Sequence, residues 1–82
     1  MPEIRVKIAS PVGLHARPAS LFVKAAAKHP GPVSIGRPGA EPVDARSMLS
    51  VLSLAINHGE EVVLNGPQEA IDELSTLLSE VD

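Results

Sequence analysis

The residues with the clearest chemical potential lie in the stretch GLHARPAS, at positions 13–20. His15 stands directly before Ala-Arg-Pro-Ala, and a helix tolerates proline only in its first turn, where the missing N–H would have had no partner. Pro18 therefore predicts a helix that begins near Ala16, with His15 at about the N-cap. Because that position normally holds Ser, Thr, Asp or Asn, the histidine calls for an explanation.

A helix start of this kind is suited to an anion. The N–H groups of Ala16 and Arg17 have no intrahelical partners, and the helix dipole adds about half a positive charge at the same end. Arg17 adds a guanidinium that can bind phosphoryl oxygens through two hydrogen bonds. The positive field favours a neutral imidazole at His15, whose lone pair is then free to attack. The stretch thus combines a nucleophile with a cradle for phosphate.

The same stretch lacks what a hydrolase needs, because no carboxylate stands within it to orient the histidine or activate water. A site that accepts a phosphoryl group without activating water is expected to hold the group and pass it on, as a carrier does. The alternative is that His15 only caps the helix and Arg17 is a solvated first-turn residue. The residues alone leave both interpretations open.

Composition limits the other function classes. The 82 residues are enough for one small domain over 1–82, and a net charge of −3 with one Phe and no Trp or Tyr argues against a nucleic-acid partner. The absence of cysteine excludes disulfides and thiolate metal sites, and the other two histidines, His29 and His58, match no metal motif, so no metal or cofactor is expected. Both are expected at helix ends. No apolar run approaches the ~18 residues of a membrane span, which predicts a cytoplasmic protein without membrane insertion.

The periodicity of apolar residues predicts seven elements in the order β-α-β-β-α-β-α. They are strands over 3–8, 32–37, 41–43 and 60–65, and helices over 16–28, 47–56 and from 68 onward. The two middle strands form a hairpin whose prolines suit an edge position. The simplest packing is an α+β fold, an open-faced β-sandwich in which a four-stranded, mostly antiparallel sheet carries three helices on one face.

GLHARPAS resembles the active-site segment of the HPr family, the histidine-containing phosphocarriers of the bacterial phosphoenolpyruvate-dependent sugar phosphotransferase system. The stretch RSMLSVLSL, at 46–54, resembles the region around the regulatory serine of the family. The likeness covers the whole chain. It implies that phosphorylated Enzyme I donates its phosphoryl group to Nδ1 of His15, that IIA domains of sugar permeases receive it, and that Arg17 neutralises its charge. Such a protein is a transiently phosphorylated carrier rather than an enzyme, and is expected to act as a monomer.

The resemblance also implies an apolar docking patch of Met48, Leu49 and Leu52 beside the active site. Ordinary core packing is the alternative for this helix. It is expected for Val51 and Leu54, and also for Leu52, which is a candidate for both roles, whereas Met48 is assigned to the docking patch. Methionine suits a surface that must fit several partners in turn.

Ser47 is first of all a credible N-cap. In Gram-positive relatives the matching serine is phosphorylated by a dedicated kinase, and a phosphate there would place negative charge on the docking patch. Regulatory partners such as a serine kinase or a transcriptional regulator would follow. A second hypothesis for the whole chain is accordingly a regulatory interaction module, in nitrogen-related or transcriptional signalling, without sugar phosphotransfer.

The sequence departs from the family pattern at four positions. Val12 stands where many relatives have a small polar residue, Ser50 and Ala55 stand where many have glycine, and Arg46 stands where many have lysine. Backbone N–H groups can substitute for the polar side chain missing at Val12, so this departure bears on the rate of transfer or the stability of the phosphoryl group rather than on activity itself.

Overall fold

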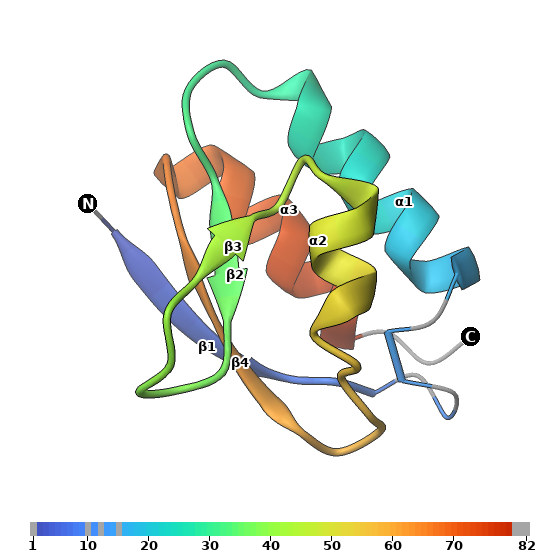
Figure 1. Ribbon diagram of the computed structural model, residues 1–82. Helices are drawn as coiled ribbons and strands as arrows, with labels where there is room; N and C mark the ends of the chain where they lie inside the picture. Colours follow the sequence, from blue (N-terminus) through green and yellow to red (C-terminus); the bar gives the residue numbers. More distant parts are fainter. Residues whose placement is uncertain (1, 10, 12, 15, 80–82) are drawn as a thin grey trace.

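Strands and helices follow one another in the order predicted from the periodicity, β-α-β-β-α-β-α (Figure 1). The computed structural model describes residues 2–9, 11, 13–14 and 16–79, with only the backbone of Ala16. The described strands are β1 (Glu3–Lys7), β2 (Ser34–Gly36), β3 (Val43–Asp44) and β4 (Glu61–Asn65). The described helices are α1 (Ala16–Lys28), α2 (Met48–Ser53) and α3 (Gln68–Ser79).

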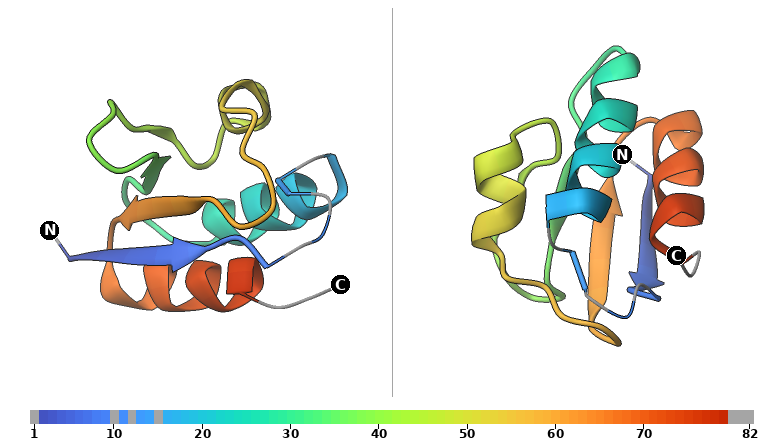
Figure 2. Two further views of the ribbon diagram at one scale, coloured as in Figure 1. Left: turned by 90° about the horizontal axis from the view of Figure 1, so that it is seen from below. Right: turned by 90° about the vertical axis from the view of Figure 1, so that its right-hand side faces the viewer.

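The strands form one sheet in the order β1-β4-β2-β3, and every neighbouring pair is antiparallel. All three helices lie on the same side of this sheet (Figures 1 and 2). Glu3, Arg5 and Lys7 of β1 are exposed, whereas Val6 is buried, as expected for a strand with one wet face. The predicted open-faced β-sandwich is confirmed.

The core lies between the sheet and the helices and is built almost entirely from aliphatic side chains. Ile35 of β2 and Leu64 of β4 are register partners and are both fully buried. Phe22 of α1 and Leu74 of α3 complete this layer with no exposed surface. Burial of such side chains contributes about 1.5–3 kcal/mol each and orients the amphipathic helices on the sheet.

The four strands and the second helix each differ from their predicted bounds by one to three residues at one end or both. The helix predicted over 47–56 ends at Ser53, because Ala55 adopts a left-handed backbone with φ of 52° that no α-helix can contain. The strand predicted over 41–43 is instead Val43–Asp44, because Pro42 cannot donate a ladder hydrogen bond. The hairpin lies at an edge of the sheet, as expected, with β3 as the edge strand and β2 paired with both β3 and β4.

Candidate functional site

The first turn of α1 is where the sequence predicts the phosphate cradle. The helix begins at Ala16, so Arg17 and Pro18 both lie in the first turn, which confirms the predicted position of the proline. Pro18 lacks an N–H where a helix would leave that group unpaired anyway, so it costs the helix no hydrogen bond. His15, the predicted nucleophile, and Val12 lie outside the described residues.

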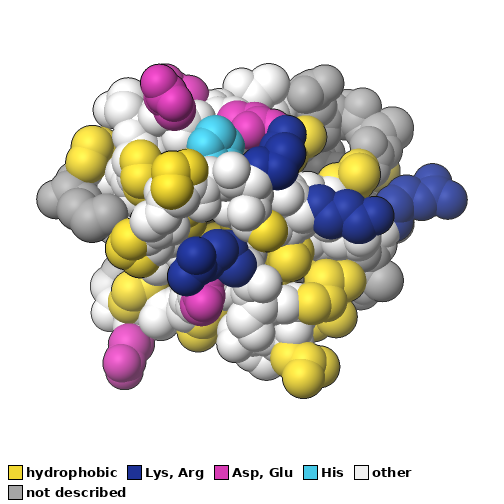
Figure 3. Space-filling model, turned by 90° about the horizontal axis from the view of Figure 1, so that it is seen from above, with side chains coloured by type: hydrophobic (Ala, Val, Ile, Leu, Met, Phe, Trp, Pro, Cys, Tyr) yellow, Lys and Arg dark blue, Asp and Glu magenta, His cyan; other side chains and the backbone are white. Residues whose placement is uncertain are grey.

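Arg17 is exposed, and α1 has no acidic residue in its first turn. Within the part of the chain that the structure describes, the Arg17 guanidinium forms no ion pair. Leu21 and Lys24 follow at helical spacing and are exposed as well, Leu21 by 51%. A space-filling view from above shows Lys and Arg side chains next to apolar ones (Figure 3). The outer face of α1 therefore offers positive charge and one large apolar side chain.

The loop before α1 is attached to the segment that follows α2. The Leu14 N–H donates a hydrogen bond of 3.0 Å to the Ile56 carbonyl oxygen, and both side chains are buried. Gly13 has a φ of 70°, and a Cβ at this position would lie 2.5 Å from the same oxygen. Only glycine fits here, both for backbone conformation and for space. The residue before His15 is thus held by a hydrogen bond and by packing.

Helix α2 lies beside α1 and carries the predicted docking residues (Figure 1). Leu49 is 83% exposed, whereas Met48 and Leu52 are half-buried and pack against the core. Val51 is fully buried, as the core-packing interpretation expected. The three candidates therefore differ in exposure. Leu49 lies at the surface, whereas Met48 and Leu52 each bury part of the side chain against the core.

Ser47 is the N-cap of α2, which confirms its predicted structural role. Its backbone is extended, and its Oγ accepts a hydrogen bond of 3.3 Å from the Ser50 N–H. Arg46, the neighbouring departure from the family pattern, is exposed, and its backbone N–H donates to Asp44 Oδ1 at 2.9 Å. The predicted regulatory serine is therefore built into the start of the helix that carries Leu49.

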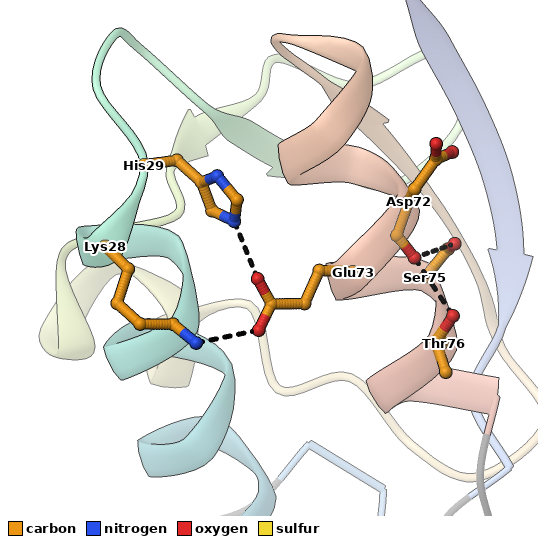
Figure 4. Close-up of polar contacts among 6 residues, drawn as sticks. All are labelled: Lys28, His29, Asp72, Glu73, Ser75 and Thr76. Carbon is orange, nitrogen blue, oxygen red and sulfur yellow. Dashed lines mark hydrogen bonds and ion pairs between the residues drawn. The ribbon is translucent and has the colours of Figure 1, made fainter.

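The two other histidines differ from each other in their surroundings. His29 follows the last residue of α1, as expected, and its Nε2–H donates to Glu73 Oε1 at 2.7 Å, while Lys28 Nζ donates to Oε2 at 2.9 Å (Figure 4). These contacts, first Lys28 and then His29, lower the pKa of Glu73 below its ordinary value. His58 was expected at a helix end, which was wrong, because α2 ends at Ser53 and His58 lies exposed in a turn before β4.

Sequence reasoning missed Arg37 and Glu60, which join the β2–β3 hairpin to the chain after α2. The Arg37 guanidinium donates to both carboxylate oxygens of Glu60 and to the backbone carbonyls of Leu54 and Ala55. Ion pairs between residues 23 positions apart leave no local pattern in a sequence. The only indication of these contacts in the sequence was Ala55, which stands where many relatives have glycine.

The described residues form neither a metal-binding cluster nor a membrane-spanning helix. Among them, no group of three or more histidine and carboxylate side chains is placed to hold a metal ion. None of the helices over those residues combines the length and apolar character needed to cross a membrane.

The chain matches the family model for the PTS HPr component phosphorylation site over residues 2–80. It is 45% identical over 84 residues to the phosphocarrier protein HPr of Streptomyces coelicolor, a match that covers 98% of this chain and 90% of the relative. It is also 34% identical over 84 residues to the HPr-like protein Crh of Bacillus subtilis, with 98% of each chain covered.

Solved structures agree with this assignment. The crystal structure of HPr-C-His from Thermoanaerobacter tengcongensis superposes with a TM-score of 0.87 at 35% identity, over 95% of this chain and 91% of that one. The phosphocarrier protein HPr from Bacillus anthracis gives 0.86 at 31% identity, over 94% and 95%. The family model, the curated relatives and the solved structures agree over nearly the whole chain, so the chain belongs to the HPr family, the phosphocarrier component of the phosphotransferase system.

Proposed function

We propose that this protein carries a phosphoryl group on Nδ1 of His15, accepts it from phosphorylated Enzyme I and passes it to the IIA domains of sugar permeases. The observation that carries the proposal is the register of α1, which begins at Ala16 with Arg17 and Pro18 in its first turn. This register makes His15 the residue directly before the free N–H groups of a helix, where an anion is stabilised.

The transfer itself requires little more than a nucleophile and charge stabilisation. The imidazole lone pair attacks phosphorus, a nitrogen–phosphorus bond forms, and the bond to the donor breaks with its electron pair leaving on the donor. The Arg17 guanidinium and the helix N–H groups neutralise the phosphoryl oxygens. Because Arg17 is exposed and no acidic residue stands in the first turn, no carboxylate of that turn competes for the cation.

A carrier must also protect the phosphoryl group from water. GLHARPAS contains no carboxylate that would act as a general base, which supports transfer over hydrolysis. A phosphorylated imidazole keeps a high transfer potential, whereas serine at the same position would form a stable ester. This difference explains why a histidine replaces the usual capping residue.

Partners dock on the surface that surrounds the first turn of α1. Leu49, with its side chain almost fully exposed, supplies an apolar contact, and Met48 and Leu52 supply their exposed portions. Arg17 adds positive charge to the same surface. The protein acts in the cytoplasm as a monomer, since each partner must reach one small site in turn.

The alternative function is a regulatory interaction module, which the similarity to Crh brings into consideration. Such a module would use Leu49 and Ser47 but would not need a phosphorylated His15. The two functions therefore differ in what happens when His15 is replaced.

Incubation with phosphoenolpyruvate and Enzyme I tests the proposal. We expect one acid-labile phosphate per chain, lost in His15→Ala and in no other single histidine variant. His58→Ala is the matched control, because His58 is exposed and lies outside the helices. Absence of acid-labile phosphate on the wild type, or its survival in His15→Ala, would leave the regulatory module as the better account.

A further inference from the structure

We infer that Arg37 and Glu60 are positioning residues for the phosphoryl acceptor, acting through the segment 54–57 that follows α2. The inference rests on the proposed function, since it concerns how His15 is held. Neither residue lies in GLHARPAS or in the helix that carries the docking patch. The pair and Leu14, the residue that precedes the acceptor in the sequence, both form contacts with the backbone of this one short segment.

The two charged side chains hold the segment through hydrogen bonds with its backbone. Arg37 Nη1 donates to the Leu54 carbonyl at 2.7 Å and Nη2 to the Ala55 carbonyl at 3.2 Å. Its Nε and Nη2 also donate to Glu60 Oε1 and Oε2, at 3.0 and 3.2 Å. Glu60 Oε2 in turn accepts from the Asn57 N–H at 2.6 Å. The pair therefore contacts three of the four residues of the segment.

The same segment also holds the loop before α1. The Ile56 carbonyl accepts the hydrogen bond from Leu14, and the backbone of Ile56 and Asn57 packs directly against Gly13. The Ile56 side chain is only 1% exposed, so the segment is also fixed to the core. A movement of the segment would move Leu14, which immediately precedes His15.

The segment needs this support because of its backbone conformation. Ala55 is the only non-glycine residue with positive φ among the described residues, at 52°. Alanine disfavours this region because its Cβ approaches the backbone oxygen, and such conformations persist only when the surroundings enforce them. The two carbonyls that Arg37 binds are those of Ala55 and of the residue before it, where the end of α2 leaves carbonyls without helical partners.

The ion pair alone would contribute little, since the side chains of Arg37 and Glu60 are 39% and 31% exposed. The hydrogen bonds that hold the segment are those from Arg37 to the Leu54 and Ala55 carbonyls and from the Asn57 N–H to Glu60. Arg37 and the Asn57 N–H lower the pKa of Glu60 below its ordinary value, so the carboxylate is charged at neutral pH.

The test compares Arg37→Ala with Arg5→Ala in phosphoryl transfer from Enzyme I. Arg5 pairs with Glu61 at 3.3 Å on the open face of the sheet, so its variant also removes one arginine and one ion pair but leaves 54–57 untouched. We expect Arg37→Ala to lower the rate at saturating Enzyme I about tenfold, because a small misplacement of a reacting group is costly. The KM for Enzyme I should stay the same, because Arg17 and Leu49 are unaltered. Arg5→Ala should have the same rate and the same KM as the wild type.

A second readout does not depend on transfer. Hydrogen exchange of the Leu14 amide should be roughly tenfold faster in Arg37→Ala than in the wild type, because its acceptor is no longer held in place. Arg5→Ala should leave it unchanged. If Enzyme I fails to phosphorylate the wild type on His15, the proposed function fails while this measurement still tests the positioning role.

Ala55→Gly supplies the rescue, because glycine adopts positive φ without strain. Arg37→Ala combined with Ala55→Gly should recover part of the lost rate, and Arg37→Lys, which keeps a donor, should lose less than Arg37→Ala. The double variant also serves where Arg37→Ala alone does not fold. Wild-type transfer rate and wild-type Leu14 exchange in Arg37→Ala would overturn the inference, as would a double variant no better than Arg37→Ala.

Discussion

At the residue scale, the described residues of GLHARPAS differ in whether they face the interior or the surface. Gly13 and Leu14 have their contacts inside the protein, with the backbone after α2. Arg17 points its charge to the surface, where it is free of first-turn carboxylates. The described residues on both sides of the predicted nucleophile are therefore held, Leu14 by its hydrogen bond to Ile56 and the backbone of Ala16 by its place in α1.

Gly13→Ala tests whether this anchoring depends on close packing as well as on φ. Gly39 has a similar φ of 80°, but a Cβ added there would meet no atom within 4 Å, so Gly39→Ala isolates the backbone cost. We expect Gly39→Ala to lose about 1 kcal/mol of unfolding free energy and Gly13→Ala about 2–4 kcal/mol, since overpacking adds to the same backbone term. Urea denaturation measures both. Equal losses would show that the contact with Ile56 is not tight.

At the element scale, the sequence predicts a helix well where its own residues decide the boundary. Pro18 and the apolar spacing locate both ends of α1, and Ser47 locates the start of α2. The end of α2 was predicted too late, because alanine favours a helix and only a distant arginine explains the left-handed turn at Ala55. Local patterns therefore predicted the start of α1 but not the segment after α2 that holds the loop before it.

Ser47 is the N-cap of α2 and also the predicted regulatory serine, and three substitutions separate the structural role from the predicted one. Ser47→Ala should lose about 1 kcal/mol of stability, whereas Ser47→Asn and Ser47→Asp should keep most of it because both side chains cap helices. Ser47→Asp should also slow phosphoryl transfer from Enzyme I, because it adds negative charge next to exposed Leu49. Urea denaturation and the transfer rate measure the two effects.

Ser47→Asn is the neutral control for that experiment. If Ser47→Asn slows transfer as much as Ser47→Asp, the effect belongs to the shape of the cap and not to charge. A phosphate on Ser47 would then have no electrostatic route to the docking patch.

At the scale of the whole molecule, contacts between distant segments complete the fold. Lys28 and His29 at the end of α1 meet Glu73 of α3, 44 or more positions away (Figure 4). Strand β4 lies in the sheet between β1 and β2. Periodicity predicts which face each element buries but not which elements become neighbours. The strand order and this three-residue cluster were therefore outside what the sequence could predict.

The Glu73 cluster predicts a particular dependence of stability on pH. Because its contacts hold the pKa of Glu73 below 4.5, the ordinary value, the stabilisation is present above that value and is lost as pH falls through the lower folded pKa. Glu73→Gln should therefore be less stable than the wild type at pH 7, and the difference should shrink toward about pH 3. Urea denaturation across this range measures it.

Glu41→Gln is the control, because Glu41 is exposed in the loop before β3. The unfolding free energy of Glu41→Gln should differ little from that of the wild type at both ends of the pH range. A Glu73→Gln difference that stayed constant across that range would contradict the assigned contacts.

The central claim, that the chain carries a phosphoryl group on His15 and passes it on, is tested most directly by a chase. The protein is phosphorylated with Enzyme I and labelled phosphoenolpyruvate, separated from the donor and mixed with a IIA domain of a sugar permease. The account predicts that label leaves His15 and reaches the IIA domain with little inorganic phosphate released. Label that stays on the chain, or that leaves as inorganic phosphate at the same rate without the IIA domain, would contradict it.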